Sequence, residues 1–285
     1  MIAASREPVA YLWEPFSILH RPGIFGARFR YWFPYVCAEN ESAFLEDVRK
    51  MLAFRYRTAA ELAAIRSPKD VLRLGRDRAR FARFRRVRAR PLLKDPIAVF
   101  SAEWLADRFD MDVVVLVRHP AAFAYSVKAR GLTHPFGHFL AQPLLMRDHL
   151  APYEERIRSF AERERPPLDQ AILLWTLIHS AIARYRDRRP DWQVRRLEDI
   201  ALDPVAAFEQ MYGRLGLPFD DAARRTVEAH SDSSNPAEVA DPAAHHRDSR
   251  RSIEVWRSRL TDEEISRVRS GVEPLAKEFY ADADW

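Results

Sequence analysis

The sequence predicts an α/β fold in which a short central parallel sheet is flanked by many helices. Residues 113–117 form an unbroken run of valine and leucine, which is typical of a parallel strand buried on both faces. Pro120 follows closely and suits the first turn of a helix that would extend to about residue 128. Residues 169–188 are apolar on most faces of a helix and are expected to be buried. Strand, tight turn and helix in this order predict an α/β unit.

The other elements follow from similar signals. Within 42–55, apolar residues recur at three- and four-residue spacing after Ser42, which predicts a helix with Ser42 as its N-cap. No internal repeat or linker divides the chain, so residues 1–285 are expected to form a single domain. The remaining expected strands lie in 8–16, 87–95 and 192–197, and the remaining expected helices are 58–66, 68 onward, 101–109 with Ser101 as cap, 135–163, 203–215, 219–230 and 253–280, with a polar loop at 231–252.

The composition excludes several classes of protein. The chain has 285 residues, of which 47% are hydrophobic and 31% charged, as in ordinary globular proteins. Cys37 is the single cysteine, so an internal disulfide is impossible and a cysteine-based zinc site is excluded. The longest apolar stretch, 171–178, is far shorter than the roughly 20 residues that a membrane span needs. No signal peptide is recognisable, and a cytoplasmic location is therefore expected.

A candidate phosphate site follows the strand 113–117. Arg118 is expected at the carboxyl end of this strand, where open α/β sheets bind ligands, and Ser126 on the helix that follows. An arginine fork with a hydroxyl group beside a helix N-terminus suits a phosphate. The alternative is that Arg118 forms a structural ion pair. The eight glycines form neither a GxxxxGK[ST] nor a GxGxxG pattern, so no glycine-rich phosphate cradle is expected.

Arginine dominates the basic residues, with 41 arginines and five lysines. Residues 73–90 alone hold nine arginines and one acid, Asp77. Four of these arginines would share one helix face and could bind a nucleic-acid backbone or an anionic glycan. No nucleic-acid-binding motif accompanies them, so a solvated surface helix is the preferred interpretation and no nucleic-acid partner is expected. The four are Arg73, Arg76, Arg80 and Arg83.

Histidines could indicate a metal site, but the usual ligand set is missing. His134 and His138 are four residues apart, and His245 and His246 are adjacent in the polar loop. No HExxH pattern accompanies either pair. No metal is therefore expected.

Arg118-His-Pro followed by Ser126 resembles the 3′-phosphate-binding element of sulfotransferases that use 3′-phosphoadenylyl sulfate (PAPS). Further segments resemble bacterial members of that family in the same order along nearly the whole chain. Each is weak alone, but the ordered set is fairly specific. They are 11–16, 93–96 with 101–105, 197–200 with 203–204 and 215–217, 247–249 with Trp256 and Leu260, and 279–280 with Trp285.

The resemblance implies a sulfotransferase-like architecture related to P-loop NTPases. It implies transfer of a sulfuryl group from PAPS, without a metal, to a hydroxyl or amine of a small-molecule or carbohydrate acceptor. Arg118 and Ser126 would hold the 3′-phosphate, together with Arg247 and Ser249 from a closing loop.

The resemblance also implies two catalytic residues. Glu14 would be the general base on the acceptor, and Lys94 would stabilise charge at the transferred group. The alternatives are structural: Glu14 could pair with Arg21, and Lys94 could pair with Asp95 or Glu103.

The start of the chain departs from the family pattern. A 5′-phosphosulfate-binding loop is expected about two dozen residues before Tyr11, a spacing typical of such βα units. Only ten residues precede Tyr11, and they contain no such loop. Either the start is placed downstream of the true one or the loop has been lost. The latter supports an alternative function, a non-catalytic protein on the same fold that binds an anionic ligand or partner through its arginine-rich face.

Overall fold

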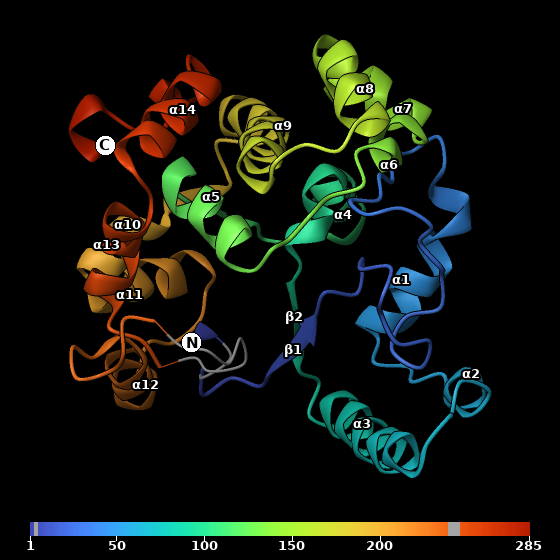
Figure 1. The fold of residues 1–285 in the computed structure, drawn as a ribbon. Coiled ribbons are helices and arrows are strands. Elements are labelled where there is room, and N and C mark those ends of the chain that lie inside the picture. Colours follow the sequence, from blue (N-terminus) through green and yellow to red (C-terminus); the bar gives the residue numbers. More distant parts are fainter. Residues whose placement is uncertain (3–4, 239–245) are drawn as a thin grey trace. The chain divides into compact units, whose positions relative to one another are not determined.

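The computed structural model describes residues 1–2, 5–238 and 246–285. The chain divides into two compact units, which are described separately. The N-terminal unit spans Ser5–Met111, and the C-terminal unit spans Asp112–Trp285 with the first residues of the chain. Each unit has a short parallel sheet with helices around it, which confirms the predicted α/β class (Figure 1). The expectation of a single domain stays a prediction.

The sheet of the N-terminal unit has two parallel strands, β1 (Val9–Trp13) and β2 (Arg90–Lys94). Trp13 at the end of β1 lies opposite Lys94 at the end of β2, so the residues that follow the two strands emerge side by side. Parallel strands need a long crossover connection, and here helices supply it. The helical segments of this unit are η2 (Glu41–Ala43), α1 (Leu45–Leu52), α2 (Thr58–Leu62), α3 (Pro68–Arg86), η3 (Pro96–Ser101) and α4 (Ala102–Phe109).

Stacked aromatic rings form the core under the loop that follows β1. The Phe16 and Phe29 ring centroids are 4.9 Å apart, and Phe29 also stacks on Phe25 at 5.4 Å. Phe44, just before α1, continues the stack at 5.3 Å from Phe29. Offset stacking of this kind stabilises beyond the burial of the rings. It explains how a loop without regular structure is held in place.

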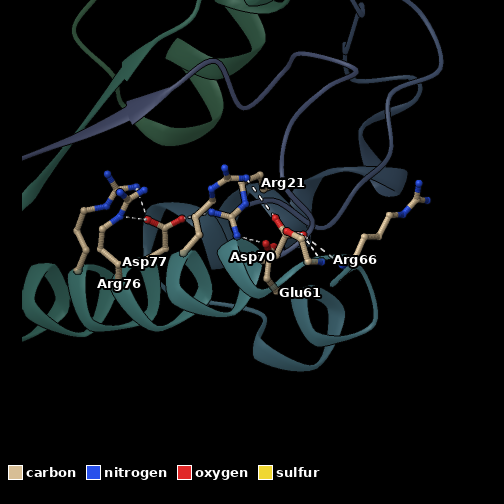
Figure 2. Close-up of polar contacts among 10 residues, drawn as sticks. Arg21, Glu61, Arg66, Asp70, Arg76 and Asp77 are labelled. Atoms are coloured by element: carbon tan, nitrogen blue, oxygen red, sulfur yellow. Dashed lines mark hydrogen bonds and ion pairs between the residues drawn. The ribbon is translucent and has the colours of Figure 1, made fainter. Parts of the chain in front are cut away.

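Arg21 in the same loop joins two helices through buried carboxylates. Its guanidinium pairs with Glu61 of α2 and with Asp77 of α3, both of which are buried (Figure 2). Gly23 N–H also donates to Glu61, at 2.8 Å. Buried carboxylates need partners of this kind because an unpaired buried charge is strongly destabilising. Arg21 is therefore a structural residue.

The C-terminal unit has a second two-stranded parallel sheet, β3 (Val114–Val117) and β4 (Gln193–Arg196). The long helix α9 (Pro167–Arg188) is buried along most of its length, as predicted, and packs against α5 and α14. The other helices are α5 (Pro120–Ala129), α6 (Gly137–Leu140), α7 (Pro143–Leu145), α8 (Glu154–Glu162), α10 (Leu197–Leu202), α11 (Pro204–Arg214), α12 (Asp221–Ser231), α13 (Ser249–Arg259) and α14 (Asp262–Val272).

Several short segments complete the C-terminal unit. Tyr212 of α11 donates its hydroxyl to the Met1 carbonyl at 2.9 Å, which ties the first residues of the chain to this unit. No helix in the described residues is long and apolar enough to cross a membrane. The short segments are the π-helical η4 (Met146–Leu150) and the 3₁₀ segments η5 (Ala151–Tyr153), η6 (Leu275–Glu278) and η7 (Asp282–Asp284).

The structure corrects one prediction about the strands. The four strands form two parallel pairs, one in each unit. The strand at 113–117 is not buried on both faces, because Leu116 of β3 is 50% exposed. β3 has a strand neighbour on one side only among the described residues, so one face and one edge lack the cover that a central strand receives.

The structure also corrects three helix predictions. Residues 135–163 do not form one long helix but a series of short segments, because Pro143 and Pro152 each lack the N–H that would continue the preceding turn. Ser42 lies in a 3₁₀ turn, and Phe44 occupies the N-cap of α1. Ser101 does precede α4, but its hydroxyl donates to the Pro34 carbonyl at 2.7 Å and not to the helix.

Candidate functional site

Arg118 is the first residue beyond the carboxyl end of β3. The Trp175 indole of α9 donates to its backbone carbonyl at 2.9 Å, which fixes the turn between β3 and α5. The Arg118 side chain is partly buried. No carboxylate among the described residues lies within ion-pair distance of its guanidinium. The structural ion pair that was the alternative for Arg118 is therefore not formed there.

Other charges around Arg118 are mostly of the same sign. Burial lowers the pKa of Arg118, and among the nearby charges Glu198 has the largest effect and raises it. The guanidinium groups of Arg247 and Arg130 lower it, each by less. Three guanidinium groups and one carboxylate thus share this region. Such an arrangement is unfavourable by itself and favours a bound anion.

Glu198 is held in place by donors other than arginine. Its Oε1 accepts from the His119 backbone N–H at 2.9 Å, and its Oε2 accepts from the Tyr280 hydroxyl at 2.9 Å. Burial and the Glu198 charge both raise the pKa of Tyr280. In the sequence, Glu198 stands out only as part of 197–200, one of the segments that resemble the sulfotransferase family. The local sequence does not indicate that Glu198 fixes the turn at Arg118.

His119 caps α5 and connects the turn to the C-terminal segment. Its Nδ1 accepts from the Ala121 backbone N–H at 3.3 Å. Its ring stacks on Trp256 with centroids 4.8 Å apart, and Trp285 meets it edge-on at 4.6 Å. Burial lowers the pKa of His119 to about 3, so the ring is neutral at physiological pH. The segments near Trp256 and Trp285 therefore support the position of Arg118.

Three further predicted phosphate ligands lie in the same unit. Ser126 is partly buried on α5, and its hydroxyl forms no hydrogen bond with the described residues. The backbone N–H of Arg247 donates to the His230 carbonyl at 3.1 Å, which anchors the chain just before α13. The Ser249 hydroxyl lies 3.0 Å from the Ala201 carbonyl and is already used there. Binding of a ligand by Ser249 would require that this contact be exchanged.

Glu14 and Lys94 lie together in the N-terminal unit. The Lys94 Nζ donates to the Glu14 Oε1 at 2.5 Å, and the Glu14 backbone N–H donates to the Lys94 carbonyl at 3.0 Å. The alternatives from the sequence are not observed, since Arg21 pairs elsewhere and Lys94 contacts neither Asp95 nor Glu103. Glu14 has a φ of 43°, a left-handed conformation that is uncommon for glutamate and recurs at functional sites.

The surroundings of this pair include a carboxylate that the sequence did not single out. Asp95 accepts from the Phe16 N–H at 2.7 Å and from the Ile97 N–H at 3.0 Å, which fixes the start of η3. Burial raises the pKa of Asp95 to about 6. On β1, the exposed ring of Trp13 lies 5.6 Å from the Lys94 Nζ. The pair thus combines two opposite charges with an aromatic surface.

The histidine pairs give no further support to a metal site. Burial lowers the pKa of His134 to about 3, and its backbone N–H donates to Gln170. His245 lies outside the described residues. Among the described residues there is no group of three or more histidine, cysteine, aspartate or glutamate side chains that could hold a metal ion.

The arginines of α3 are exposed, as predicted for a surface helix. Arg76 lies 3.6 Å from Asp77 (Figure 2). Arg73 pairs with Asp70 at 3.5 Å, and Arg80 lies 3.7 Å from Asp77. The inward face of the helix is anchored by Phe81, which is fully buried. Four further arginines of α3 form no ion pair with the described residues, namely Arg78, Arg83, Arg85 and Arg86.

Comparisons with known proteins give one structural likeness. No family model matches the chain, and no curated protein matches it. Among solved structures, the chain is similar to a sulfotransferase domain from the curacin biosynthetic pathway. The likeness covers 78% of this chain and 77% of that one, with 15% sequence identity and a TM-score of 0.41. At this level it adds no weight to the site, which depends on the contacts described above.

Proposed function

We propose that this protein is a sulfotransferase that moves a sulfuryl group from PAPS to a hydroxyl or amine of a small-molecule or carbohydrate acceptor. The observation that carries the proposal is the Arg118 guanidinium, which is partly buried, lacks a carboxylate partner among the described residues and lies near two further arginines. A phosphate supplies the negative charge that this arrangement lacks. The sequence resemblance assigns the 3′-phosphate of PAPS to the same residue.

Several features of the C-terminal unit support a phosphate at Arg118. A guanidinium group can bind two phosphate oxygens at once, and the charge of Arg247 adds to the attraction. The N-terminus of α5 begins two residues after Arg118 and favours negative charge. Ser126, whose hydroxyl forms no hydrogen bond with the described residues, is the proposed further donor. Ser249 is proposed as a donor only after its contact with Ala201 has opened.

The proposed chemistry assigns the proton and the charge to Glu14 and Lys94. The acceptor oxygen or nitrogen bonds to the sulfur, and the bond between the sulfur and the 5′-phosphate oxygen breaks. The electron pair stays on that phosphate oxygen, and adenosine 3′,5′-bisphosphate leaves. Glu14 takes the acceptor proton, and the Lys94 ammonium offsets the developing charge. The Lys94 ammonium contacts Oε1 of Glu14 at 2.5 Å, and the second carboxylate oxygen is the one proposed to take the proton.

A transfer assay tests the function. The full chain is incubated with PAPS and a panel of phenols, amines and oligosaccharides, and released adenosine 3′,5′-bisphosphate is measured by chromatography. Acceptor-dependent release is expected, with a loss of at least about 100-fold in Glu14→Gln, in line with removal of a general base. Glu7→Gln is the matched control, since Glu7 is an exposed carboxylate of the same unit. Equal release by the wild type and Glu14→Gln would contradict the role of Glu14.

The exposed arginines of α3 support a second candidate function, the binding of a polyanion without catalysis. The four arginines without ion pairs in the described residues give this helix an uncompensated positive charge. A filter-binding titration with heparin or duplex DNA tests it. The logarithm of affinity should fall linearly with the logarithm of salt concentration, by about 0.9 per neutralised DNA phosphate. No binding at low salt would exclude this candidate.

A further inference from the structure

A second concave site lies in the C-terminal unit, along strand β4. It is a cavity of about 680 Å³, within the range of small-molecule sites. All four residues of β4 line it, although successive side chains of a strand point to opposite faces. Val117 of the paired strand β3 lines it as well, so the cavity lies against both strands of this sheet.

Helices supply much of the remaining lining. Arg186 lies in the last turn of α9 and Arg189 directly follows that helix, while α11 contributes Ala207, Gln210 and Arg214. Apolar surface comes from three other places, namely Val194 of β4, Ile200 of α10 and Phe279. Neither Arg118 nor Arg247 lines the cavity, so it is separate from the proposed nucleotide site.

The lining carries more positive than negative charge. Five arginines and three acids line the cavity, and the acids are already engaged. Glu278 pairs with Arg186 at 2.8 Å, and Asp203 caps α11 by accepting from the Ala206 N–H. Asp199 lies 3.6 Å from Arg196.

Two of the lining arginines, Arg195 and Arg214, form no ion pair with the described residues. They come from different walls, one from β4 and the other from α11. Two uncompensated guanidinium groups that line one cavity favour an anionic ligand.

We infer that this cavity binds a small organic anion. Its acidic group pairs with Arg195 and Arg214, and its apolar body lies against Val194, Ile200 and Phe279. A small molecule fits better than an extended peptide, because β4 offers only four residues for pairing.

The aromatic sulfonate 8-anilinonaphthalene-1-sulfonate is a suitable probe, since it joins an anion to an apolar body and fluoresces in apolar sites. Titration of the full chain should show one saturable site per molecule. The double variant Arg195→Gln/Arg214→Gln should weaken binding at least about tenfold. The matched control is Arg163→Gln/Arg225→Gln, which changes two exposed arginines of the same unit and should bind as the wild type. Circular dichroism on each variant verifies the fold.

A competition experiment distinguishes binding in this cavity from binding at the nucleotide site, and the control variant reports nonspecific adsorption of the probe. Saturating adenosine 3′,5′-bisphosphate should leave probe binding unchanged, because Arg118 and Arg247 lie outside the cavity. Unchanged binding in the Arg195→Gln/Arg214→Gln variant, equal weakening in the control, or displacement by the bisphosphate would overturn the inference.

Discussion

Two arginines show how differently the same side chain is used in this molecule. Arg21 lies between two buried carboxylates and joins α2 to α3 in the N-terminal unit. Arg118 follows β3 in the C-terminal unit, where other arginines are near and no carboxylate of the described residues pairs with it. With 41 arginines in the chain, the residue type alone says little about function. The counter-ion distinguishes the two: the paired guanidinium of Arg21 stabilises the fold, and we propose that the partly buried guanidinium of Arg118 binds a ligand.

The largest expected effect comes from Arg21. Arg21→Leu leaves Glu61 and Asp77 buried without this partner, and loss of one member of a buried ion pair costs about 3–5 kcal/mol. Urea denaturation should show this loss in the free energy of unfolding. Arg66→Leu is the control, because the Arg66 side chain is exposed and forms no ion pair with the described residues, and it should change stability by less than about 0.5 kcal/mol. Equal stability of the two variants would remove the distinction drawn between paired and unpaired arginines.

Acid should affect the two units differently. In the C-terminal unit, burial lowers the pKa of His119, His134 and His179 to about 3. These rings stay neutral when folded but take up protons near pH 6.5 when unfolded, so their stabilising effect is present above pH 6.5 and is lost as the pH falls. By pH 5 each costs about 2 kcal/mol. In the N-terminal unit, burial raises the pKa of Asp95 to about 6. The effect of this group on stability therefore changes with pH in the opposite direction, and it becomes more favourable as the pH falls.

Hydrogen exchange followed by mass spectrometry at pH 7 and pH 5 would resolve this difference. After correction for the intrinsic dependence of exchange on pH, protection of α9 should fall more than protection of β1 and β2. His179→Leu should reduce the acid sensitivity of α9, because it removes one titrating group. An equal loss of protection in both units would show that the buried histidines do not control the acid response.

The smallest expected effects come from alanine substitutions at one glycine in each unit. Gly75 lies within α3, where an added Cβ meets nothing within 4 Å. Gly75→Ala should therefore stabilise by up to about 1 kcal/mol through helix propensity. Gly216 follows α11 with a φ of 64°, so Gly216→Ala should destabilise by about 1 kcal/mol although it also has free space. Thermal denaturation should show a higher Tm for Gly75→Ala and a lower Tm for Gly216→Ala. A higher Tm for Gly216→Ala would contradict the backbone argument.

The sequence predicts local features of this fold well where they depend on single residues. Pro68, Pro120 and Pro204 each begin a helix at the expected place, because proline suits the first turn. The strand at 113–117 was also located by its composition. The burial of this strand could not be predicted in the same way. Burial depends on which strands pair, and a local sequence pattern does not determine the pairing.

The candidate site was predictable for the residues that end strands. Arg118 and Lys94 follow from their positions at the ends of β3 and β2. The partners that fix them were not predictable, because Glu198 is 79 residues from His119 and Asp95 is 79 residues from Phe16. The anchoring of Ser249 to Ala201 likewise joins residues 48 positions apart. Contacts over such separations depend on the assembled fold and not on spacing.

The central claim, that Arg118 binds a phosphate and does not hold the fold together, is tested most directly by thermal denaturation with adenosine 3′,5′-bisphosphate. At 100 times its Kd the ligand should stabilise the wild type by about 2.7 kcal/mol. Arg118→Ala should lose this stabilisation while its stability without ligand stays within about 1 kcal/mol of the wild type. The control Arg225→Ala, at an exposed arginine of α12, should keep it. A full shift in Arg118→Ala, or its unfolding without ligand, would contradict the claim.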